Sequence, residues 1–453
     1  MKKEHIKKMH DQAEKVFSYA ENEMDYRESW RIFRIMAEFV EGYQFLSKLK
    51  NNVTILGSAR LSADNKYSQV ARELGALLGK ADFCVLTGGG PGIMEAANRG
   101  AFEVKGKSFG LNIELPFEQI LNPYVTGFTS FNYFFTRKVM LTSPASAFVI
   151  FPGGYGTLDE FFEIVDLMEQ GMMQKVPVVL VGKEFWNPIL QFLLKSPCSI
   201  GAVSENIVRS WKVVETAEEA FRLVKPTKDK PLICDLAPHS FQCMGNIDWK
   251  IFRIMSELVA GFEFLTSMKN NITVLGTKSI SPRHRYYRSA RELGNLLAEY
   301  GYMTLTGGGM GIAEATNMGA YQNDGVSVGL GLKIGDEVLL NKYLTKSLDF
   351  IFPFTRKLMV TAPSRGFVFF PGGFGTFHQL FEVLTLMQTG KMSRRPVVLF
   401  DHKFWGPLHT FIKEDLVHRF ATISNEDDEF YQIVDNIDSV MEVMENSRPL
   451  KRK

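Results

Sequence analysis

An internal repeat constrains the fold of this chain more than any other feature of its sequence. The repeated motifs begin at Trp30 and Trp249, Thr87 and Thr306, Thr136 and Thr355, and Phe185 and Phe404. The members of every pair lie 219 positions apart, so no net insertion separates the copies across this stretch, and the register slips only beyond Trp186. A period this long is far above that of a solenoid unit. Each copy is therefore expected to be a complete domain with its own core, and the chain to be a covalent pseudo-dimer.

The positions of the two copies predict the domain boundaries within the 453 residues. Residues 30–225 are expected to form the first domain and residues 247–445 the second. Between them, residues 226–246 carry three prolines and several charges, a composition typical of a linker. Residues 1–29 are predicted to be a charged helical extension, and residues 446–453 a basic tail.

Short apolar runs alternate with longer helical patterns in both copies, which predicts βαβ units and a parallel sheet flanked by helices. The strands expected in the first copy are Val53–Leu56, Phe83–Leu86, Ser108–Ile113, Ala147–Phe151 and Val176–Val181. Those expected in the second are Ile272–Leu275, Tyr302–Leu305, Ser327–Leu332, Gly366–Phe370 and Pro396–Phe400. An amphipathic helix precedes each set, at Trp30–Leu46 and Trp249–Leu265, and is expected to be a packing or dimerisation element. The predicted fold class is α/β.

The charge balance and the cysteine count exclude several classes of protein. Lysine plus arginine number 52 against 50 aspartate plus glutamate, so no net field recruits nucleic acid or an anionic membrane. The four cysteines, Cys84, Cys198, Cys234 and Cys243, are too few and too scattered for a disulfide framework or a paired zinc motif. The lysine-rich N-terminus lacks the apolar core of a secretory signal, and no apolar run approaches the roughly 18–20 residues of a membrane-spanning helix. We therefore expect a soluble, cytoplasmic protein without a metal site.

Three of the expected strands in the first copy end directly in glycine-rich turns. These turns contain Gly57 and Ser58; Gly88, Gly89, Gly90 and Gly92; and Gly153, Gly154, Gly156 and Thr157. In an open parallel sheet ligands bind beyond the carboxyl ends of the strands, and glycine lets backbone N–H groups approach an anion closely. Glycines also simply form tight turns, but several such turns, repeated in a second copy, favour a phosphate site. The turns lack a P-loop lysine pattern and a clean dinucleotide fingerprint, which disfavours an ATPase or a dehydrogenase.

Three motifs taken together resemble one protein family. They are Thr136-Arg-Lys138, the glycine turn that ends in Met94 and Glu95, and Pro152-Gly-Gly-Tyr-Gly-Thr-Leu-Asp-Glu160. The combination resembles the Lonely Guy family of cytokinin-activating phosphoribohydrolases and related bacterial nucleotide nucleosidases, long mislabelled as lysine decarboxylases. The resemblance extends over residues 51–186 and again over residues 270–405.

The resemblance carries specific expectations about fold and activity. It implies two tandem, modified Rossmann-like domains of a usually dimeric type. It implies cleavage of an AMP-like nucleoside 5′-monophosphate to free base and ribose 5-phosphate without a cofactor. The catalytic residues that it implies are Arg137 and Glu160.

Glu160 and Arg137 are of the residue types that N-glycosidic hydrolysis needs, because positive charge builds on the ribose while electrons move toward the departing base. Glu160 can stabilise that charge, hold a ribose hydroxyl or activate water, and Arg137 can fix the phosphate or orient the nucleotide. The substrate and its phosphate are expected to contact the three glycine turns, Met94, Glu95 and Lys138. Two alternatives stay open: Thr157 and Glu160 have the spacing of a capping box, and the helix dipole alone favours Glu95.

The second copy keeps the scaffold of the site but loses the carboxylate, because Gln379 replaces Glu160. Glutamine serves a capping box equally well but carries no negative charge. His378 replaces Asp159 and is expected to be a solvent-facing helix residue. Met310 replaces Pro91, a change expected to alter the base pocket. The residues retained in this second site are Gly307, Gly308, Gly309, Arg356, Lys357, Gly372, Gly373, Gly375 and Thr376.

We expect one working site and one degenerate site, which either binds a nucleotide for regulation or only completes the interface. A non-catalytic nucleotide-binding, carrier or sensor protein is the main alternative, and Glu160 beside Arg137 favours the enzyme. A lysine decarboxylase would need a lysine Schiff base to pyridoxal phosphate and a partner for the ring nitrogen, a set that the sequence does not assemble. The expected partner is a small-molecule nucleotide, not nucleic acid or a membrane, and a further homo-oligomer stays open.

Overall fold

The computed structural model describes residues 27–115, 121–229, 247–334 and 337–446 of the chain. Most of the predicted extension (1–26), most of the predicted linker (230–246) and nearly all of the predicted basic tail (447–453) lie outside the described residues. Within the described ranges, no helix is both long and apolar enough to cross a membrane.

The first copy folds into a seven-stranded sheet in which every neighbouring pair of strands is parallel. Along the chain the strands are β1 (Asn52–Leu56), β2 (Cys84–Thr87), β3 (Lys107–Ile113), β4 (Gly127–Phe131), β5 (Ala145–Ile150), β6 (Val178–Val181) and β7 (Lys212–Val214). Their spatial order is β4-β3-β2-β1-β5-β6-β7. The central strands β1, β2 and β6 bury every residue, because helices cover both faces of the sheet.

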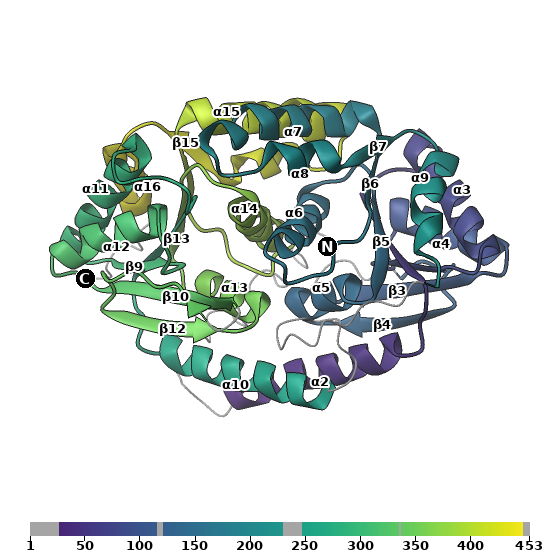
Figure 1. The fold of residues 1–453 in the computed structure, drawn as a ribbon, viewed down its shortest axis with the longest axis horizontal. Coiled ribbons are helices and arrows are strands. Elements are labelled where there is room, and N and C mark those ends of the chain that lie inside the picture. Colours follow the sequence, from purple (N-terminus) through teal and green to yellow (C-terminus); the bar gives the residue numbers. More distant parts are fainter. Residues whose placement is uncertain (1–26, 116–120, 230–246, 335–336, 447–453) are drawn as a thin grey trace, which may run out of the picture.

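The helices of the first copy divide between the two faces of its sheet. They are α2 (Arg27–Leu46), α3 (Lys66–Lys80), α4 (Ile93–Glu103), α5 (Phe134–Thr142), α6 (Tyr155–Glu169), α7 (Lys183–Lys195), α8 (Glu205–Ser210) and α9 (Ala217–Val224), with short 3-10 turns at Cys198–Ile200 and Lys225–Thr227. Helices α3, α4 and α9 pack on the outer face, whereas α5 and α6 lie on the inner face, toward the second copy (Figure 1).

The second copy repeats this arrangement in an eight-stranded sheet. Its strands are β8 (Asn271–Leu275), β9 (Met303–Thr306), β10 (Ser327–Ile334), β11 (Glu337–Val338), β12 (Lys346–Phe350), β13 (Gly366–Phe369), β14 (Val397–Phe400) and β15 (Gln432–Val434). Its helices are α10 (Ile247–Leu265), α11 (Arg285–Glu299), α12 (Ile312–Gln322), α13 (Pro353–Thr361), α14 (Phe374–Gln388), α15 (His402–Phe411) and α16 (Ile437–Asn446), with a π-helix at Ile412–Arg419 and a 3-10 helix at Asn425–Phe430. The main path is β11-β10-β9-β8-β13-β14-β15, with β12 also paired to β10. The pairs are parallel except β10 with β11.

The ten predicted strands are all present, with ends within two residues of the predicted ones, which confirms the α/β fold class. The sequence prediction missed β4, β7, β11, β12 and β15. Strands β4 and β12 pair at one end of each sheet and are partly exposed, so their apolar pattern is weak. Strands β7 and β15 have only three residues, too few for a pattern to emerge.

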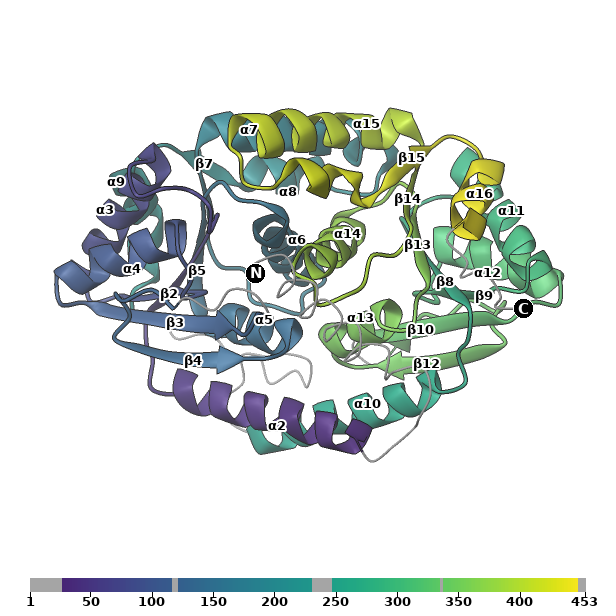
Figure 2. The same cartoon turned by 180° about the vertical axis from the view of Figure 1, so that it is seen from behind.

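The two copies pack face to face with approximate two-fold symmetry (Figures 1 and 2). Helices α6 and α14 lie side by side at the centre, where the Phe162 and Phe381 rings stack with centroids 5.5 Å apart and planes 2° apart. These two residues are 219 positions apart, so the approximate axis passes between them. Helix α2 contacts α10 along one edge and α7 contacts α15 along the opposite edge, and the first contact confirms the predicted packing role of the amphipathic helices.

The strand order sets the place where a ligand can bind. From β1 the chain adds β2, β3 and β4 on one side, and then crosses over to add β5, β6 and β7 on the other. The neighbours β1 and β5 are therefore the switch point of the first sheet, as β8 and β13 are in the second. Open α/β sheets bind ligands beyond the carboxyl ends of such strands. The glycine turns follow these strands directly.

Candidate functional site

Two of the predicted glycine turns meet at the switch point of the first sheet. Backbone hydrogen bonds connect them, from the Ser58 N–H to the Pro152 carbonyl at 3.0 Å and from the Phe151 N–H to the Leu56 carbonyl at 2.8 Å. A Cβ atom on Gly57 would come within 2.9 Å of side-chain atoms of Ile93 and Phe151. Glycine is therefore required at this position by the close packing of the two turns.

The third turn, from Gly88 to Gly92, is held by a buried amide network that the sequence analysis missed. Asn122 Nδ2 donates to the Gly89 and Gly90 carbonyls at 3.1 Å and to Asn98 Oδ1 at 3.0 Å. Asn98 Oδ1 also accepts a 2.6 Å hydrogen bond from the Thr87 hydroxyl. The same network recurs in the second copy around Asn317 and Asn341. Identity at an offset of 219 was the signal that marks these asparagines in the sequence.

Arg137 reaches this turn from helix α5. Its Nε donates to the Leu111 carbonyl at 2.8 Å, and its guanidinium crosses Gly88 so closely that a Cβ atom there would lie 2.2 Å from Nη2. The sulfur of Met94 lies against the same glycine. Only glycine leaves room for the guanidinium, so the position of Arg137 depends on glycine at residue 88. The predicted residues Arg137, Gly88 and Met94 are thus brought together.

A buried carboxylate in α2 fixes the position of α5, a role that the sequence did not reveal. Glu38 accepts hydrogen bonds from the Asn132 N–H at 2.7 Å, from the Tyr133 N–H at 3.4 Å and from the Thr136 hydroxyl. These groups form the start of α5, where no side chain of the helix itself provides a cap. Glu257 does the same for α13 in the second copy. The amphipathic helices therefore position the helices that carry Arg137 and Arg356 in addition to packing against one another.

Glu160 lies in α6, and its Oε1 is 3.8 Å from Nη1 of Arg137. Burial raises the pKa of Glu160 to about 7, even though the positive charge of Arg137 opposes this rise. Burial also lowers the pKa of Arg137, which Glu160 opposes in turn. Near neutral pH the carboxyl therefore exists in both protonation states beside a fixed cation. A group poised in this way is suited to acid–base work and to stabilising a developing positive charge.

The capping box considered for Thr157 and Glu160 is absent from the structure. Helix α6 begins at Tyr155, its N-cap is Gly154, and no side chain caps it. Thr157 instead packs against Gly153, where a Cβ atom would lie 2.1 Å from the threonine Oγ1. Glu160 is thus the sixth residue of α6, beyond the positions whose side chains cap a helix. For Glu95 the alternative stays open, because it lies in the first turn of α4.

Each glycine turn of the type Pro-Gly-Gly is closed by backbone of the other copy. A Cβ atom on Gly154 would lie 2.8 Å from the Thr422 carbonyl oxygen, and one on Gly373 would lie 2.4 Å from the Ala202 carbonyl oxygen. The two closing residues are 220 positions apart, one more than the repeat offset, which places the register slip between the turns and these segments. Both candidate sites are therefore built from both copies.

Lys138, predicted to contact the phosphate, is buried at the interface between the copies. Its Nζ lies 2.6 Å from the Asp159 carboxylate and 3.8 Å from that of Glu163. These carboxylates raise the pKa of Lys138 although burial opposes them. The described partners of Lys138 are carboxylates on α6, and contact with a phosphate stays a prediction.

The expectation that His378 faces solvent is wrong, because this residue is only 1% exposed. Its Nδ1 lies 2.5 Å from Nζ of Lys357, and its Nε2 lies 3.3 Å from Oδ1 of Asp159 in the other copy. Burial and the neighbouring Lys357 lower the pKa of His378 well below its usual value, so the ring is neutral. A neutral ring accepts from Lys357 at Nδ1, so its hydrogen is on Nε2, the atom that lies near Asp159. His378, which stands in the second copy at the position of Asp159, thus contributes to the contact between α6 and α14.

In the second copy the scaffold is the same but the charges differ. Arg356 donates from Nε to the Leu330 carbonyl at 2.6 Å and crosses Gly307 as Arg137 crosses Gly88. Gln379 stands buried at the position of Glu160 and brings no carboxylate to Arg356. Met310, at the position of Pro91, is 51% exposed. The described second site retains the fixed guanidinium and lacks the acid.

A second charge difference concerns the glycine turns themselves. The carboxylate of Asp166, in α6 of the first copy, lies against Gly375 of the second, where a Cβ atom would be 3.1 Å from Oδ1. Asp166 also pairs with Lys357 at 3.1 Å. At the corresponding place in the first site, Gly156 faces Thr385, whose methyl group would lie 3.8 Å from such a Cβ atom. The second turn therefore has an internal anion beside it, whereas the first has a neutral side chain.

Several acids and a histidine gather between α6 and α14, yet they do not form a metal site. The ammonium groups of Lys138 and Lys357 lie among these carboxylates where a cation would otherwise sit. Among the residues that the structure describes, no group of three or more His, Cys, Asp or Glu side chains has the arrangement to hold a metal ion. The cluster is an ion-pair network of the interface.

Comparison with known proteins gives a match to a protein-family model described as "Possible lysine decarboxylase", over residues 94–224 and again over residues 313–444. A cytokinin riboside 5′-monophosphate phosphoribohydrolase of Rhodococcoides fascians is 27% identical over 146 residues, which are 31% of this chain and 73% of that protein. An enzyme of the same name from Arabidopsis thaliana is 30% identical over 194 residues, which are 40% of this chain and 84% of that protein.

Solved structures give a weaker comparison. The molybdenum cofactor binding protein of Rippkaea orientalis aligns with 39% of this chain and 96% of its own, at 19% identity and a TM-score of 0.31. A likeness at this level supports no functional argument. The double match to the family model agrees with a duplicated domain.

Proposed function

Because the chain belongs to the Lonely Guy family, whose model is described as "Possible lysine decarboxylase", we propose that it hydrolyses the N-glycosidic bond of a nucleoside 5′-monophosphate. The products are the free base and ribose 5-phosphate. The relatives that it matches are phosphoribohydrolases by name, and they are covered over most of their length. The base is left unassigned, with an AMP-like substrate as the working expectation.

One observation carries this proposal: the largely buried pair of Glu160 and Arg137 at the switch point of the first sheet, 3.8 Å apart and beside the glycine turns. We assign the phosphate to the backbone N–H groups of the turns that contain Gly153 and Gly156, at the start of α6. Arg137, fixed by the Leu111 carbonyl, orients the nucleotide. The ribose then lies near Glu160.

The chemistry needs a group that tolerates positive charge on the sugar. As the bond breaks, the electron pair leaves with the base and C1′ becomes oxocarbenium-like. The Glu160 carboxylate stabilises that charge, and it accepts a proton from the water whose oxygen bonds to C1′. The base nitrogen that received the electron pair takes up one proton in turn, which restores the Glu160 carboxylate and completes the free base. A pKa near 7 suits this role, because the ionised form is available at neutral pH and still binds a proton readily.

We propose that the second copy completes the interface and does not bind the substrate. Gln379 lacks the charge, and the Asp166 carboxylate, although paired with Lys357, lies beside Gly375 and disfavours a phosphate there. On this proposal the chain is a covalent pseudo-dimer with domains at residues 30–225 and 247–445. The cytoplasmic location expected from the sequence stays a prediction.

Decarboxylation of lysine finds no support at Lys138, the lysine of the shared motif. A Schiff base requires a neutral amine, whereas the Asp159 and Glu163 carboxylates hold the Lys138 ammonium in its charged form. The side chain is also buried between the copies. The family description therefore does not indicate the reaction of this chain.

The test is to incubate the purified protein with AMP, CMP and GMP and to measure free base and ribose 5-phosphate. We expect release of both products in equal amounts from at least one substrate. An inactive protein that binds AMP would overturn the hydrolase proposal and favour a nucleotide carrier or sensor.

A further inference from the structure

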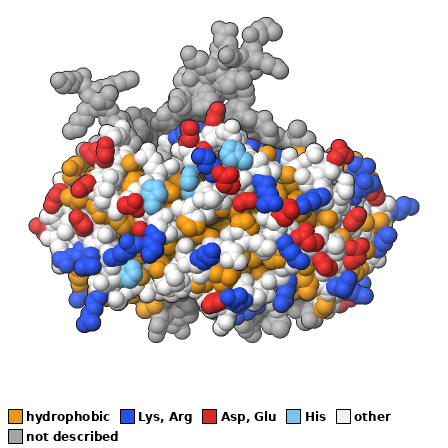
Figure 3. All heavy atoms as spheres, turned by 90° about the horizontal axis from the view of Figure 1, so that it is seen from above, with side chains coloured by type: hydrophobic (Ala, Val, Ile, Leu, Met, Phe, Trp, Pro, Cys, Tyr) orange, Lys and Arg blue, Asp and Glu red, His pale blue; other side chains and the backbone are white. Residues whose placement is uncertain are grey.

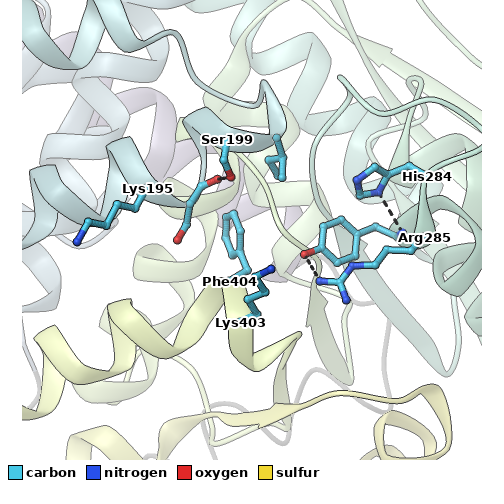
Figure 4. Close-up of a pocket in the computed structure, with 9 residues that line it drawn as sticks. Lys195, Ser199, His284, Arg285, Lys403 and Phe404 are labelled. Carbon is cyan, nitrogen blue, oxygen red and sulfur yellow. Dashed lines mark hydrogen bonds between the residues drawn. The ribbon is translucent and has the colours of Figure 1, made fainter.

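A second concave site lies at the junction of the two copies, apart from the glycine turns. It is a cavity of about 250 Å³. The first copy contributes Lys195, Ser196, Ser199 and Ile200, and the second contributes His284, Arg285, Tyr286, Lys403 and Phe404. Figure 4 shows side chains from both copies around the hollow. The lining residues among those described include three permanent cations and no carboxylate.

The termini of three helices meet at this cavity. Lys195 is the last residue of α7, Lys403 lies in the first turn of α15, and His284 is the N-cap of α11. His284 Nδ1 accepts a 3.2 Å hydrogen bond from the Tyr286 N–H, so in the neutral ring Nε2 carries the hydrogen and can donate. The N-terminal ends of α11 and α15 add partial positive charge, and Lys195 offsets the partial negative charge at the C-terminal end of α7. The environment is suited to an anion.

Arg285 is held in place at the cavity by a carboxylate that does not line it. Its Nη2 donates to Asp401 Oδ2 at 2.8 Å. It also donates to the Tyr286 hydroxyl at 2.8 Å (Figure 4). The guanidinium also lies 4.6 Å from the centre of the Tyr286 ring. Because the planar group is oriented in advance, less freedom is lost when it binds a ligand.

The corresponding place in the first copy is electrically neutral. There Glu184 occupies the position that corresponds to Lys403. Asp415 occupies the position that corresponds to Lys195, at the offset of 220 that applies beyond the register slip. Glu184 pairs with Lys66 at 2.9 Å and with Arg419 at 3.7 Å, and Arg419 pairs with Asp415 at 3.6 Å. Every cation of this counterpart therefore has an acid beside it.

The counterpart is also filled. Phe420, at the position of Ile200, packs on Phe185 with ring centroids 5.2 Å apart and on Tyr67 at 6.2 Å. In the second copy the smaller Ile200 leaves that volume open. The first copy thus has a filled, neutral site at this position, and the second copy has an open, cationic cavity at the corresponding position.

The positive character is local to the cavity. Figure 3, which views the face on which α7 and α15 lie, shows acidic and basic side chains mixed across that face. The chain as a whole has a formal net charge of only +2. A general basic surface therefore does not explain the three cations at this cavity, and a specific anion does.

We propose that this cavity binds a small phosphate monoester, of the size of a sugar phosphate. Such an ester carries nearly two negative charges at neutral pH, which Lys195 and Lys403 can match, while Arg285, whose charge Asp401 offsets, adds oriented hydrogen-bond donors. The volume is below the roughly 300–1,000 Å³ of pockets for drug-sized ligands, so the ligand is small. The site goes beyond the hydrolase proposal, because it shares no residue with the glycine turns.

The experiment is calorimetric titration of the full chain with ribose 5-phosphate, with ribose as the uncharged control. The variant Lys195→Asp/Lys403→Glu installs the charges of the first copy and is expected to weaken one binding event by about tenfold or more. Ile200→Phe, which fills the cavity without a charge change, is expected to remove the same event. Lys183→Glu, an exposed change on α7 outside the cavity, is the matched control and is expected to bind as the parent protein does.

The outcomes separate this proposal from the proposed hydrolase. Equal titrations for the parent and for both cavity variants would overturn the site, and so would equal binding of ribose. Neither cavity variant alters the glycine turns, so hydrolysis of a nucleoside monophosphate, assayed without added ribose 5-phosphate, is expected to stay unchanged in them. A protein that lacks hydrolase activity but loses the binding event in the variants would contradict only the proposed function.

Discussion

The two switch-point sites have nearly the same backbone and different chemistry. Both have glycine turns held by buried asparagines, and both have an arginine crossing a glycine. They differ in the groups that touch the proposed substrate, because the first has Glu160 where the second has Gln379. The comparison shows that folding preserves the turns and the arginine, whereas the acid can be lost without disturbing them.

The interface between the copies explains why the second site could diverge in this way. Asp166 and His378 serve the contact between α6 and α14, and in doing so they place a carboxylate beside the second glycine turn. In a dimer of identical chains any such change would enter both sites. In a covalent pair of copies, a substitution that improves the interface can alter one site while the other site keeps its charged residues.

The largest expected effect concerns Glu160. Replacement of Glu160 by Gln should lower kcat/KM by about 10²- to 10⁴-fold, because the carboxylate that stabilises the sugar and takes the proton is lost. Steady-state release of free base measures this effect. The matched change Gln379→Glu should leave the rate of the chain nearly unaltered, and an active Glu160→Gln protein would end the assignment of the working site to the first copy.

The symmetric part of the molecule should respond symmetrically. Phe162→Ala and Phe381→Ala should each lower the free energy of unfolding by about 3–5 kcal/mol, because both rings are fully buried and stack on each other. Urea denaturation checks this. Phe128→Ala, at a residue that is 54% exposed, is the control and should cost well under about 1 kcal/mol. Strongly unequal losses for the two central rings would break the two-fold comparison.

The stability of the protein should depend on pH through Glu160 but not through Gln379, because only Glu160 has a titratable carboxyl. The unfolded chain releases the Glu160 proton near pH 4.5, whereas the folded state holds it to about pH 7, so this carboxyl costs stability increasingly as the pH rises through that window. Glu160→Gln should therefore raise the free energy of unfolding at pH 8 by up to about 3 kcal/mol. The gain should shrink toward pH 5, as measured by denaturation at both pH values. A gain that is the same at pH 5 and pH 8 would show that burial of the charge is not its cause.

The smallest expected effect tests the role of Asp166. Thr385→Asp would place a carboxylate beside Gly156, as Asp166 lies beside Gly375, and should raise KM for the nucleotide by about tenfold with kcat less affected. Thr385→Asn, which has nearly the same shape without the charge, is the control. An unchanged KM in the aspartate variant would mean that this residue does not exclude phosphate from the second turn.

Much of the fold and part of the site followed from local sequence patterns. The strands that run through the middle of each sheet are mostly apolar, so β1, β2, β5 and β6 were found within two residues of their ends. The partly exposed strand β4 gave no such pattern. At the site, the resemblance to the Lonely Guy family implied Arg137 and Glu160, and the structure brings them within 3.8 Å of each other.

Other site features depend on contacts that no local pattern reports. Glu38 caps the helix of Arg137 across 98 positions of the chain, so nothing near either residue reveals the pairing. His378 was expected at the surface from the general burial tendency of histidine, whereas α6 of the first copy covers it. The lesson is that a residue's burial depends on the neighbouring copy as well as on its own helix.

By itself, the sequence determined that two similar α/β domains follow one another and that glycine turns end their central strands. It also determined that the second copy has Gln379 where the first has Glu160. These properties are local or periodic, so a single reading of the chain contains them. Only the tertiary structure decided which groups are buried together: the closing of each glycine turn by the other copy, the Asp166 carboxylate beside Gly375, and the cationic cavity near Lys403. The reason is that charge pairing and burial depend on distances through space, and the packing of one copy on the other sets those distances.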